Sequence, residues 1–177
     1  MLTIGIAVVR VVLGAFVAAH GVQKLTHFWG GGGLAASTKE FQDDGFVGGK
    51  FTAFAAGGVQ VAGGTLLIAG FLTPLASAMV IGPMVVATTV KAPVGFWSQD
   101  GGYEYPLFLA LLGIGVAFTG PGAFSFDHAT GLSAWYGQGA WSWVPPVAAT
   151  AAGVFGGLGA RVLLHRPALT TSRGRTL

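Results

Sequence analysis

Long runs of apolar residues, separated by short polar stretches, make up most of the chain. Five such runs stand out, at Leu2–Val22, Phe51–Leu72, Leu75–Val90, Glu104–Thr119 and Val144–Leu164. A helix needs about 20 residues, with a range of about 17 to 25, to cross the hydrocarbon core of a bilayer. The first, second and fifth runs reach this length, whereas the third and fourth are shorter. The pattern predicts an all-α protein with five transmembrane helices.

Prolines and tight turns refine the arrangement of these helices. Pro83 lies inside the third run and predicts a kink, whereas Pro106 lies in the first turn of the fourth run, where a missing N–H is tolerated. The turn "GFLTPL" at residues 70–75 joins the second and third runs so closely that their helices must be antiparallel neighbours. Small residues recur at helical spacing in stretches such as "AFAAGGVQVAGGTLL", which predicts close helix packing.

The composition supports a membrane protein. Hydrophobic residues make up 53% of the chain and charged residues only 8%, with a mean hydropathy of +0.69. Soluble domains carry about 25% charged residues, so this chain has too little polar surface to coat a water-facing globule. The chain contains no cysteine, which excludes disulfides, thiol catalysis and iron–sulfur ligation by its own side chains.

The positive charge indicates an orientation rather than a nucleic-acid partner. The net charge is +3, but the basic residues are few and are scattered between the apolar runs. With five spans, one side of the membrane receives nearly all of them: Lys24, Lys39, Lys50, Lys91, Arg161, Arg166, Arg173 and Arg175. The positive-inside rule makes that side cytoplasmic. We therefore expect a multi-pass protein with its N-terminus outside and a basic cytoplasmic tail at residues 165–177.

The ends of the runs carry two further signals. The N-terminal "MLTIGIAVV" lacks the basic start of a cleaved signal peptide, so the first run is expected to remain as an anchor. The tryptophans lie near predicted helix ends or in loops, where an interfacial aromatic belt is expected; they are Trp29, Trp97, Trp135, Trp141 and Trp143. Residues 129–143 are expected to form an aromatic loop before the fifth helix.

Arg10 and Gln60 are polar side chains at mid-membrane positions. Arg10 shares a helix face with Gly14 and Gly21, and such a face points into a bundle rather than into lipid. The sequence allows a buried, paired arginine or one that snorkels to the outer surface. Asp127 lies at the outer level as the expected partner of Arg10, with a solvated loop aspartate as the alternative. Gln60 lies among small residues, where its amide would form an interhelical hydrogen bond or contact a ligand.

A second group of polar residues lies at the predicted inner level. The motif "HGVQKL" places His20, Gln23 and Lys24 at the end of the first run, and Glu104 opens the fourth run at the same level. We predict that these four residues form a polar cluster at the inner mouth of the bundle, as a candidate binding site. The alternatives are an ordinary polar helix end at the lipid headgroups and, for Glu104, a favourable interaction with the helix dipole.

The histidines do not indicate a haem or metal site. They are His20, His27, His128 and His165. The first two flank a helix end, whereas the others fall in a loop and in the tail, so no haem pair is expected. We expect no metal site, and the sequence identifies no catalytic residue.

Several of these motifs together resemble one family. Arg10 is followed by "HGVQKL" and "FWGG", then by "GGTLLIAGFLTPLAS", and then by "GGYEYPLFLALLGIGVAFTGPGAFSFD" ending at Asp127. Over about residues 4–128 this order resembles the DoxX family of small bacterial integral membrane proteins. The resemblance implies an antiparallel four-helix bundle at residues 1–128 in a bacterial plasma membrane. The fifth helix at residues 144–164 is an addition to that plan.

The resemblance also implies a connection with redox chemistry. The DoxX family takes its name from a subunit of an archaeal quinone-linked oxidase of sulfur compounds, and an actinobacterial relative is associated with a membrane complex that involves superoxide dismutase and a sulfurtransferase. We therefore expect an accessory or quinone-interacting subunit of a membrane redox complex, which is not catalytic alone and for which quinone is the candidate cofactor.

Two other functions and a set of partners also follow from the sequence. The chain could be a scaffold that recruits soluble redox enzymes through the expected cytoplasmic loop "STKEFQDDGFVGGK" and the basic tail, or a transporter of small molecules or protons. The expected partners are the lipid bilayer, redox-complex subunits or soluble enzymes, and a second copy of the chain, but no nucleic acid.

Overall fold

The computed structural model describes residues 1–137, 139–140 and 142–166, and within these ranges the chain is helical without a β-strand. The long helices are α1 (Leu2–Leu25), α3 (Lys50–Ala69), α4 (Thr73–Lys91), α5 (Glu104–Thr119) and α8 (Val144–Leu164). The short elements are α2 (Gly33–Asp43), α6 (Phe126–Ala129), α7 (Ser133–Gly137) and the 3₁₀ turns η1 (Phe28–Gly30) and η2 (Ser98–Asp100).

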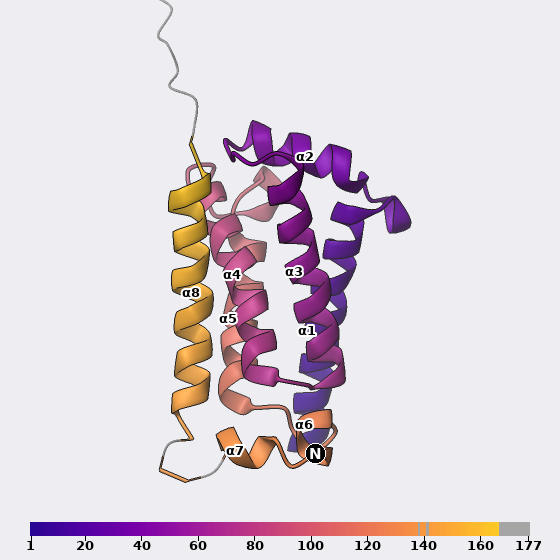
Figure 1. Ribbon diagram of the computed structural model, residues 1–177, viewed down its shortest axis with the longest axis vertical. Helices are drawn as coiled ribbons and strands as arrows, with labels where there is room; N and C mark the ends of the chain where they lie inside the picture. Colours follow the sequence, from indigo (N-terminus) through magenta and orange to yellow (C-terminus); the bar gives the residue numbers. More distant parts are fainter. Residues whose placement is uncertain (138, 141, 167–177) are drawn as a thin grey trace, which may run out of the picture.

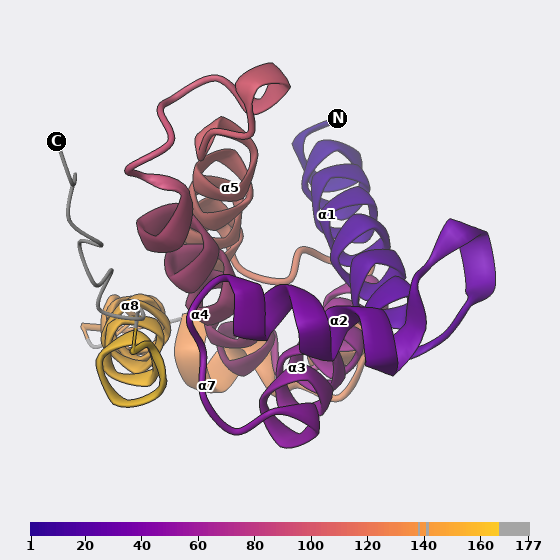
Figure 2. The same ribbon diagram turned by 90° about the horizontal axis from the view of Figure 1, so that it is seen from above.

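The helices α1, α3, α4 and α5 form an antiparallel bundle, and α8 packs outside it against α4 and α5 (Figures 1 and 2). Successive long helices run in opposite directions, so the N-terminus and the last turn of α8 lie at opposite ends (Figure 1). We call the end with α2 and the last turn of α8 the inner end, and the end with the N-terminus, α6 and α7 the outer end. The predicted fold class, a four-helix bundle with an added helix, is confirmed.

Four of these helices, α1, α3, α4 and α8, are long and apolar enough to cross a bilayer. The helix α5 has 16 residues. At 1.5 Å per residue it is about 24 Å long, a few ångströms less than the hydrocarbon core of about 30 Å. Large apolar side chains project outward from the bundle, as a lipid-facing surface requires; examples are Val8, Phe16, Phe54, Phe108 and Phe155.

Small residues set the spacing between the helices. A Cβ atom placed on Gly14 of α1 would lie 2.6 Å from the carbonyl oxygen of Gly64 in α3. A Cβ atom on Gly157 of α8 would lie 2.6 Å from the carbonyl oxygen of Gly82 in α4. Any larger residue at these contacts would push the helices apart, so the glycines allow the close packing that their spacing predicted. Between the helices lies an apolar core that includes Leu13, Val17, Leu67, Val80, Leu109 and Val116.

The structure differs from the sequence prediction between the first two spans. The helix α1 continues to Leu25, so the polar residues of "HGVQKL" are helical. The stretch that was expected to be a loop contains α2, which crosses the inner end of the bundle (Figure 1). The apolar pattern could not reveal α2 because only Gly33 and Ser37 of this helix are buried. The predicted aromatic loop at 129–143 contains α7, and of the predicted tail only residues 165–166 lie inside the described ranges.

Candidate functional site

Arg10 is buried at the outer end, with an exposed fraction of 1%. Its guanidinium group donates hydrogen bonds to the carbonyl oxygens of Leu67 and Ile68 (2.8 Å for Ile68) in the last turn of α3. It also donates to the carbonyl oxygen of Phe124, at 2.5 Å. The last carbonyl groups of a helix lack partners within the helix. Arg10 therefore caps the C-terminal end of α3 instead of snorkelling to the membrane surface.

Asp127 caps the next helix from the other side of the same turn. Its carboxylate is fully buried and accepts hydrogen bonds from the backbone N–H groups of Leu72 (2.8 Å) and Thr73 (2.9 Å) and from the Thr73 hydroxyl (2.7 Å). Arg10 and Asp127 form no direct ion pair in the structure, although the sequence suggested one. Each charge instead binds the oppositely charged end of a helix dipole, Arg10 at the end of α3 and Asp127 at the start of α4.

The turn between these two helices depends on unusual backbone geometry. Gly70 has a φ of +65°, and a Cβ atom there would lie 2.6 Å from Nη1 of Arg10. Leu72 has a φ of +49°, which costs about 1–3 kcal/mol for a residue other than glycine. The hydrogen bond to Asp127 holds Leu72 in this conformation. We call Arg10, Gly70, Thr73 and Asp127 the outer clamp.

Tyr136 of α7 extends the outer clamp, a role that the sequence did not indicate. Its buried hydroxyl group has no hydrogen-bond partner among the described residues. Burial and the nearby Asp127 carboxylate raise the pKa of Tyr136 above its ordinary value. The polar atoms of the clamp are largely committed to helix ends and to the turn. The outer clamp is therefore a structural element that fixes how α3, α4 and α6 meet.

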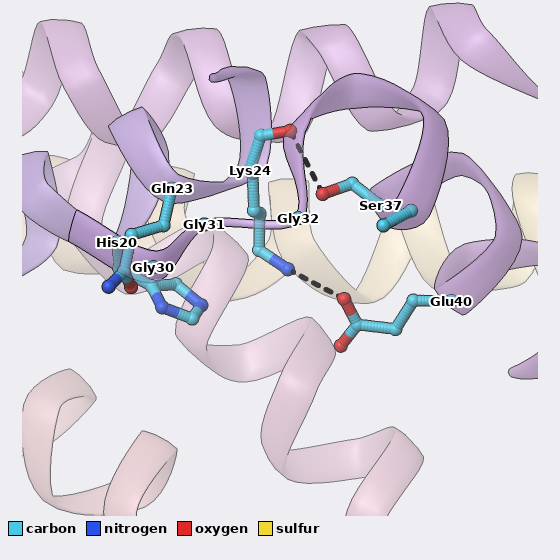
Figure 3. A pocket seen from close by; sticks show the side chains of 9 residues that line it. His20, Gln23, Lys24, Gly30, Gly31, Gly32, Ser37 and Glu40 are labelled. Carbon is cyan, nitrogen blue, oxygen red and sulfur yellow. Dashed lines mark hydrogen bonds and ion pairs between the residues drawn. The ribbon is translucent and has the colours of Figure 1, made fainter. Parts of the chain in front are cut away.

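A polar pocket of about 360 Å³ lies at the inner end (Figure 3). It is lined by His20, Gln23 and Lys24 of α1, by residues 30–32, and by Ala36, Ser37 and Glu40. Lys24 Nζ lies 3.4 Å from Glu40 Oε2, and the Ser37 hydroxyl donates to the carbonyl oxygen of Lys24 at 2.9 Å. Gln23 Nε2 donates to the carbonyl oxygen of Trp29 at 2.8 Å. These contacts attach α2 to the end of α1.

The acidic residue in this pocket is Glu40 and not Glu104. The Glu104 carboxylate accepts a hydrogen bond from the backbone N–H of Ser98, at 3.0 Å, and it does not line the pocket. The expected four-residue cluster is therefore incomplete: His20, Gln23 and Lys24 lie together, whereas Glu104 holds the loop before α5. Glu40 reaches Lys24 because α2 folds back over the end of α1. Since α2 was not predicted from the sequence, this ion pair could not be predicted either.

A larger cavity of about 810 Å³ meets the polar pocket, and the two share His20, Lys24 and Glu40. Its walls come from α1, α3, α4, α5 and α8 and are mostly apolar; they include Ala56, Val59, Met79, Pro83, Leu109 and Ala152. This volume lies within the range of about 300–1,000 Å³ typical of small-molecule sites, which combine apolar walls with a few polar groups.

Gln60 is a buried polar side chain in the wall of this larger cavity. Only 3% of it is exposed, and its buried Oε1 has no hydrogen-bond partner among the described residues. The interhelical hydrogen bond that the sequence allowed is therefore not formed by this oxygen. A buried polar atom without a partner costs about 1–3 kcal/mol. His20 lines the same cavity, and its imidazole forms no hydrogen bond with the described residues. The next residue, Gly21, packs closely against Gln60.

Comparison with known proteins identifies the family of the chain. The DoxX family model matches residues 5–92. The chain belongs to the DoxX family. No curated protein and no solved structure matches the chain. The DoxX segment supplies α1 to α4, and with them Arg10, His20, Glu40 and Gln60. Asp127 of the outer clamp and the whole of α8 lie outside the matched residues.

Family and fold together establish a multi-pass membrane protein in contact with the lipid bilayer. Within the DoxX segment, the described residues contain no group of three His, Asp or Glu side chains that could hold a metal ion. The larger cavity combines a mostly apolar volume with two side chains that form no hydrogen bond with the described residues, His20 and Gln60. The ion pair between Lys24 and Glu40 lies at its inner mouth. This combination suits an amphipathic ligand with a polar head and a hydrocarbon tail.

Proposed function

We propose that this DoxX protein binds a quinone in the larger cavity and acts as an accessory subunit of a membrane redox complex. The observation that carries the proposal is the buried amide oxygen of Gln60, which has no hydrogen-bond partner among the described residues and lies in a mostly apolar wall. A glutamine amide carries a donor and an acceptor. It can therefore donate to the carbonyl oxygen of a quinone and accept from the hydroxyl of a quinol.

The other residues of the cavity fit the rest of such a molecule. His20 offers a second hydrogen-bonding group at the inner mouth, and the apolar walls would surround a hydrocarbon tail. When bound, the quinone would supply the capacity to accept and release electrons. This chain has no cysteine and so no thiolate to hold an iron–sulfur cluster. Electrons would come from a partner subunit, which is why we assign an accessory role.

A binding titration tests the proposal. The protein in lipid nanodiscs is titrated with decylubiquinone, and the Kd is compared between the wild type, Gln60→Leu and the control Gln42→Leu on the exposed side of α2. Since a neutral hydrogen bond contributes about 0.5–1.5 kcal/mol, Gln60→Leu should raise the Kd about 3- to 10-fold. Gln42→Leu should leave the Kd unchanged. Equal Kd values for all three proteins would contradict the role of Gln60.

Although Gln60→Leu should weaken quinone binding, it should not lower the stability of the ligand-free protein. Removing a buried polar atom without a partner relieves its desolvation cost, so the ligand-free variant should be at least as stable as the wild type. A loss of quinone binding together with unchanged or higher stability would separate a ligand-binding role from a structural one. If Gln60→Leu instead destabilises the ligand-free protein, Gln60 serves helix packing.

A scaffold role is the second candidate, because α2 presents a charged surface at the inner end. Lys39 and Asp43 form an ion pair of 2.7 Å there, with side chains 76% and 65% exposed. A soluble enzyme that docks on this surface should be lost from the purified complex after Lys39→Glu. Retention of all co-purifying proteins in Lys39→Glu would argue against docking at α2.

A further inference from the structure

The helix α2 and the loop that follows it form part of the lining of the larger cavity at its inner end. Glu40, Phe41, Asp44, Phe46 and Gly48 all line this cavity, and all belong to α2 or to its connection with α3. We propose that α2 is a hinged lid over the cavity and that α8 provides its latch. The purpose of such a lid rests on the proposed ligand binding, but its existence can be tested without a ligand.

The latch is a short contact between the α2–α3 loop and the end of α8. Phe46 and His165 form an isolated antiparallel β-bridge. Two backbone hydrogen bonds flank it, from Val47 N–H to the carbonyl oxygen of Leu164 and from Arg166 N–H to that of Gly45, both at 2.7 Å. A single bridge with two hydrogen bonds can open without disturbing any long helix.

Phe46 fills the space beneath this bridge. It is 7% exposed, and its ring meets Phe41 at 5.4 Å and His165 at 5.2 Å between ring centroids, both edge to face. The ring thus joins α2 to α8 across the mouth of the cavity. Since Phe46 is also part of the cavity lining, its withdrawal would open the cavity toward the inner end.

Two ion pairs add to the latch. Lys24 and Glu40 lie 3.4 Å apart, and Lys91 and Asp44 lie 3.8 Å apart. Glu40 is 57% exposed, and the Lys91–Asp44 pair is 40% and 31% exposed. Exposed pairs of this kind hold weakly, each contributing about a two- to five-fold bias between two states. They favour the closed position without locking it.

Glycines on both sides of α2 provide the hinges. Residues 30–32, which precede α2, and its first residue, Gly33, are all glycine. Gly45, Gly48 and Gly49 follow α2, each with a positive φ. Only Gly33 and Ser37 of α2 are buried, so little apolar contact fixes the helix to the bundle. A rigid helix between two flexible segments and with few buried contacts is the usual form of a gating element.

The proposed latch also gives α8 a role in holding the lid. This helix lies outside residues 5–92, which match the DoxX family model, yet its end supplies His165, Leu164 and Arg166 to the contact. Tight packing of Gly153 and Gly157 against α4 holds α8 in place. The moving half of the lid therefore belongs to the DoxX segment, and the fixed half belongs to the additional helix.

A single engineered cysteine can report whether the lid opens, since the chain has no cysteine of its own. Ala56→Cys places the reporter in the cavity wall on α3. The full-length protein in liposomes is treated on both sides with a charged maleimide, which cannot reach the cavity through lipid. The labelling rate is measured with the latch intact, with Asp44→Asn and with Phe46→Leu. The matched control is Asp43→Asn, which breaks the ion pair with Lys39 on the exposed face of α2.

The lid predicts a two- to five-fold faster labelling with Asp44→Asn, a larger increase with Phe46→Leu and no change with Asp43→Asn. Equal rates in all variants, whether fast or slow, would overturn it. A second reporter, Gln42→Cys on the exposed side of α2, should be labelled equally in every background and so verifies reagent access and folding. If Phe46→Leu fails to fold, Asp44→Asn decides the outcome. Because no quinone is present, failure of the lid and failure of quinone binding are distinguishable.

Discussion

Replacing Asp127 by alanine should destabilise the bundle severely, although this residue lies outside the long helices. Its buried carboxylate accepts three hydrogen bonds at the start of α4. Removing one member of a buried charged network costs about 3–5 kcal/mol, because the remaining polar groups lose their partners. The free energy of unfolding should fall by this amount in Asp127→Ala. Asp127→Asn keeps one acceptor oxygen and the side-chain shape, and should lose about 1–2 kcal/mol, as for a weakened helix cap.

The assay is unfolding of the detergent-solubilised protein by increasing SDS, followed by far-UV circular dichroism. Asp43→Asn on the surface of α2 is the control, and it should stay within about 0.5 kcal/mol of the wild type because its ion pair is exposed. The outer clamp would be refuted if Asp127→Ala were no less stable than Asp43→Asn.

A double-mutant cycle tests how Arg10 and Asp127 cooperate. They do not touch, yet they hold opposite sides of one turn. Once Arg10→Leu has released the end of α3, the turn is already loosened, so the further loss from Asp127→Asn should be smaller. We expect a coupling of about 0.5–3 kcal/mol. Strictly additive losses would show that the two residues act on independent parts of the structure.

Two further predictions concern α7 and α8. The pKa of Tyr136 is raised by burial and by Asp127, so the contribution of Tyr136 to stability is complete below its ordinary pKa of about 10 and is lost as the pH rises above it. Alkaline titration should therefore destabilise the wild type more steeply than Tyr136→Phe, and parallel curves would contradict this. Gly157→Leu should detach α8, because its side chain would meet the carbonyl of Gly82. Proteolysis between α7 and α8 should then accelerate, whereas Gly159→Leu on an open surface should behave as the wild type.

The long helices could be predicted well because their formation depends on local apolar content. The turn at Gly70 and the close packing of small residues follow from patterns within a single helix or turn, whereas the sequence left open whether Arg10 is buried or snorkels to the surface. The partners of Arg10 could not be predicted in this way. They are backbone carbonyl groups of α3, which carry no sequence signal.

The inner site was predicted in part, for a related reason. His20, Gln23 and Lys24 share the end of one helix, so their proximity follows from helical spacing. Glu104 was assigned to them because it lies at the same membrane level, but level alone does not bring side chains together. Glu40 replaces it through α2, a helix with too few buried residues to show an apolar pattern. The orientation of the protein in the membrane stays a prediction.

The measurement that tests the central proposal most directly is the quinone content of the purified protein. The wild type, Gln60→Leu and Gln42→Leu are isolated from native membranes in a mild detergent, and the bound lipids are extracted and quantified by mass spectrometry. A cavity of about 810 Å³ has the size of one small-molecule site, so we predict roughly one quinone per chain in the wild type and in Gln42→Leu, and several-fold less in Gln60→Leu. A wild-type protein without quinone, or an equal content in Gln60→Leu, would contradict the account.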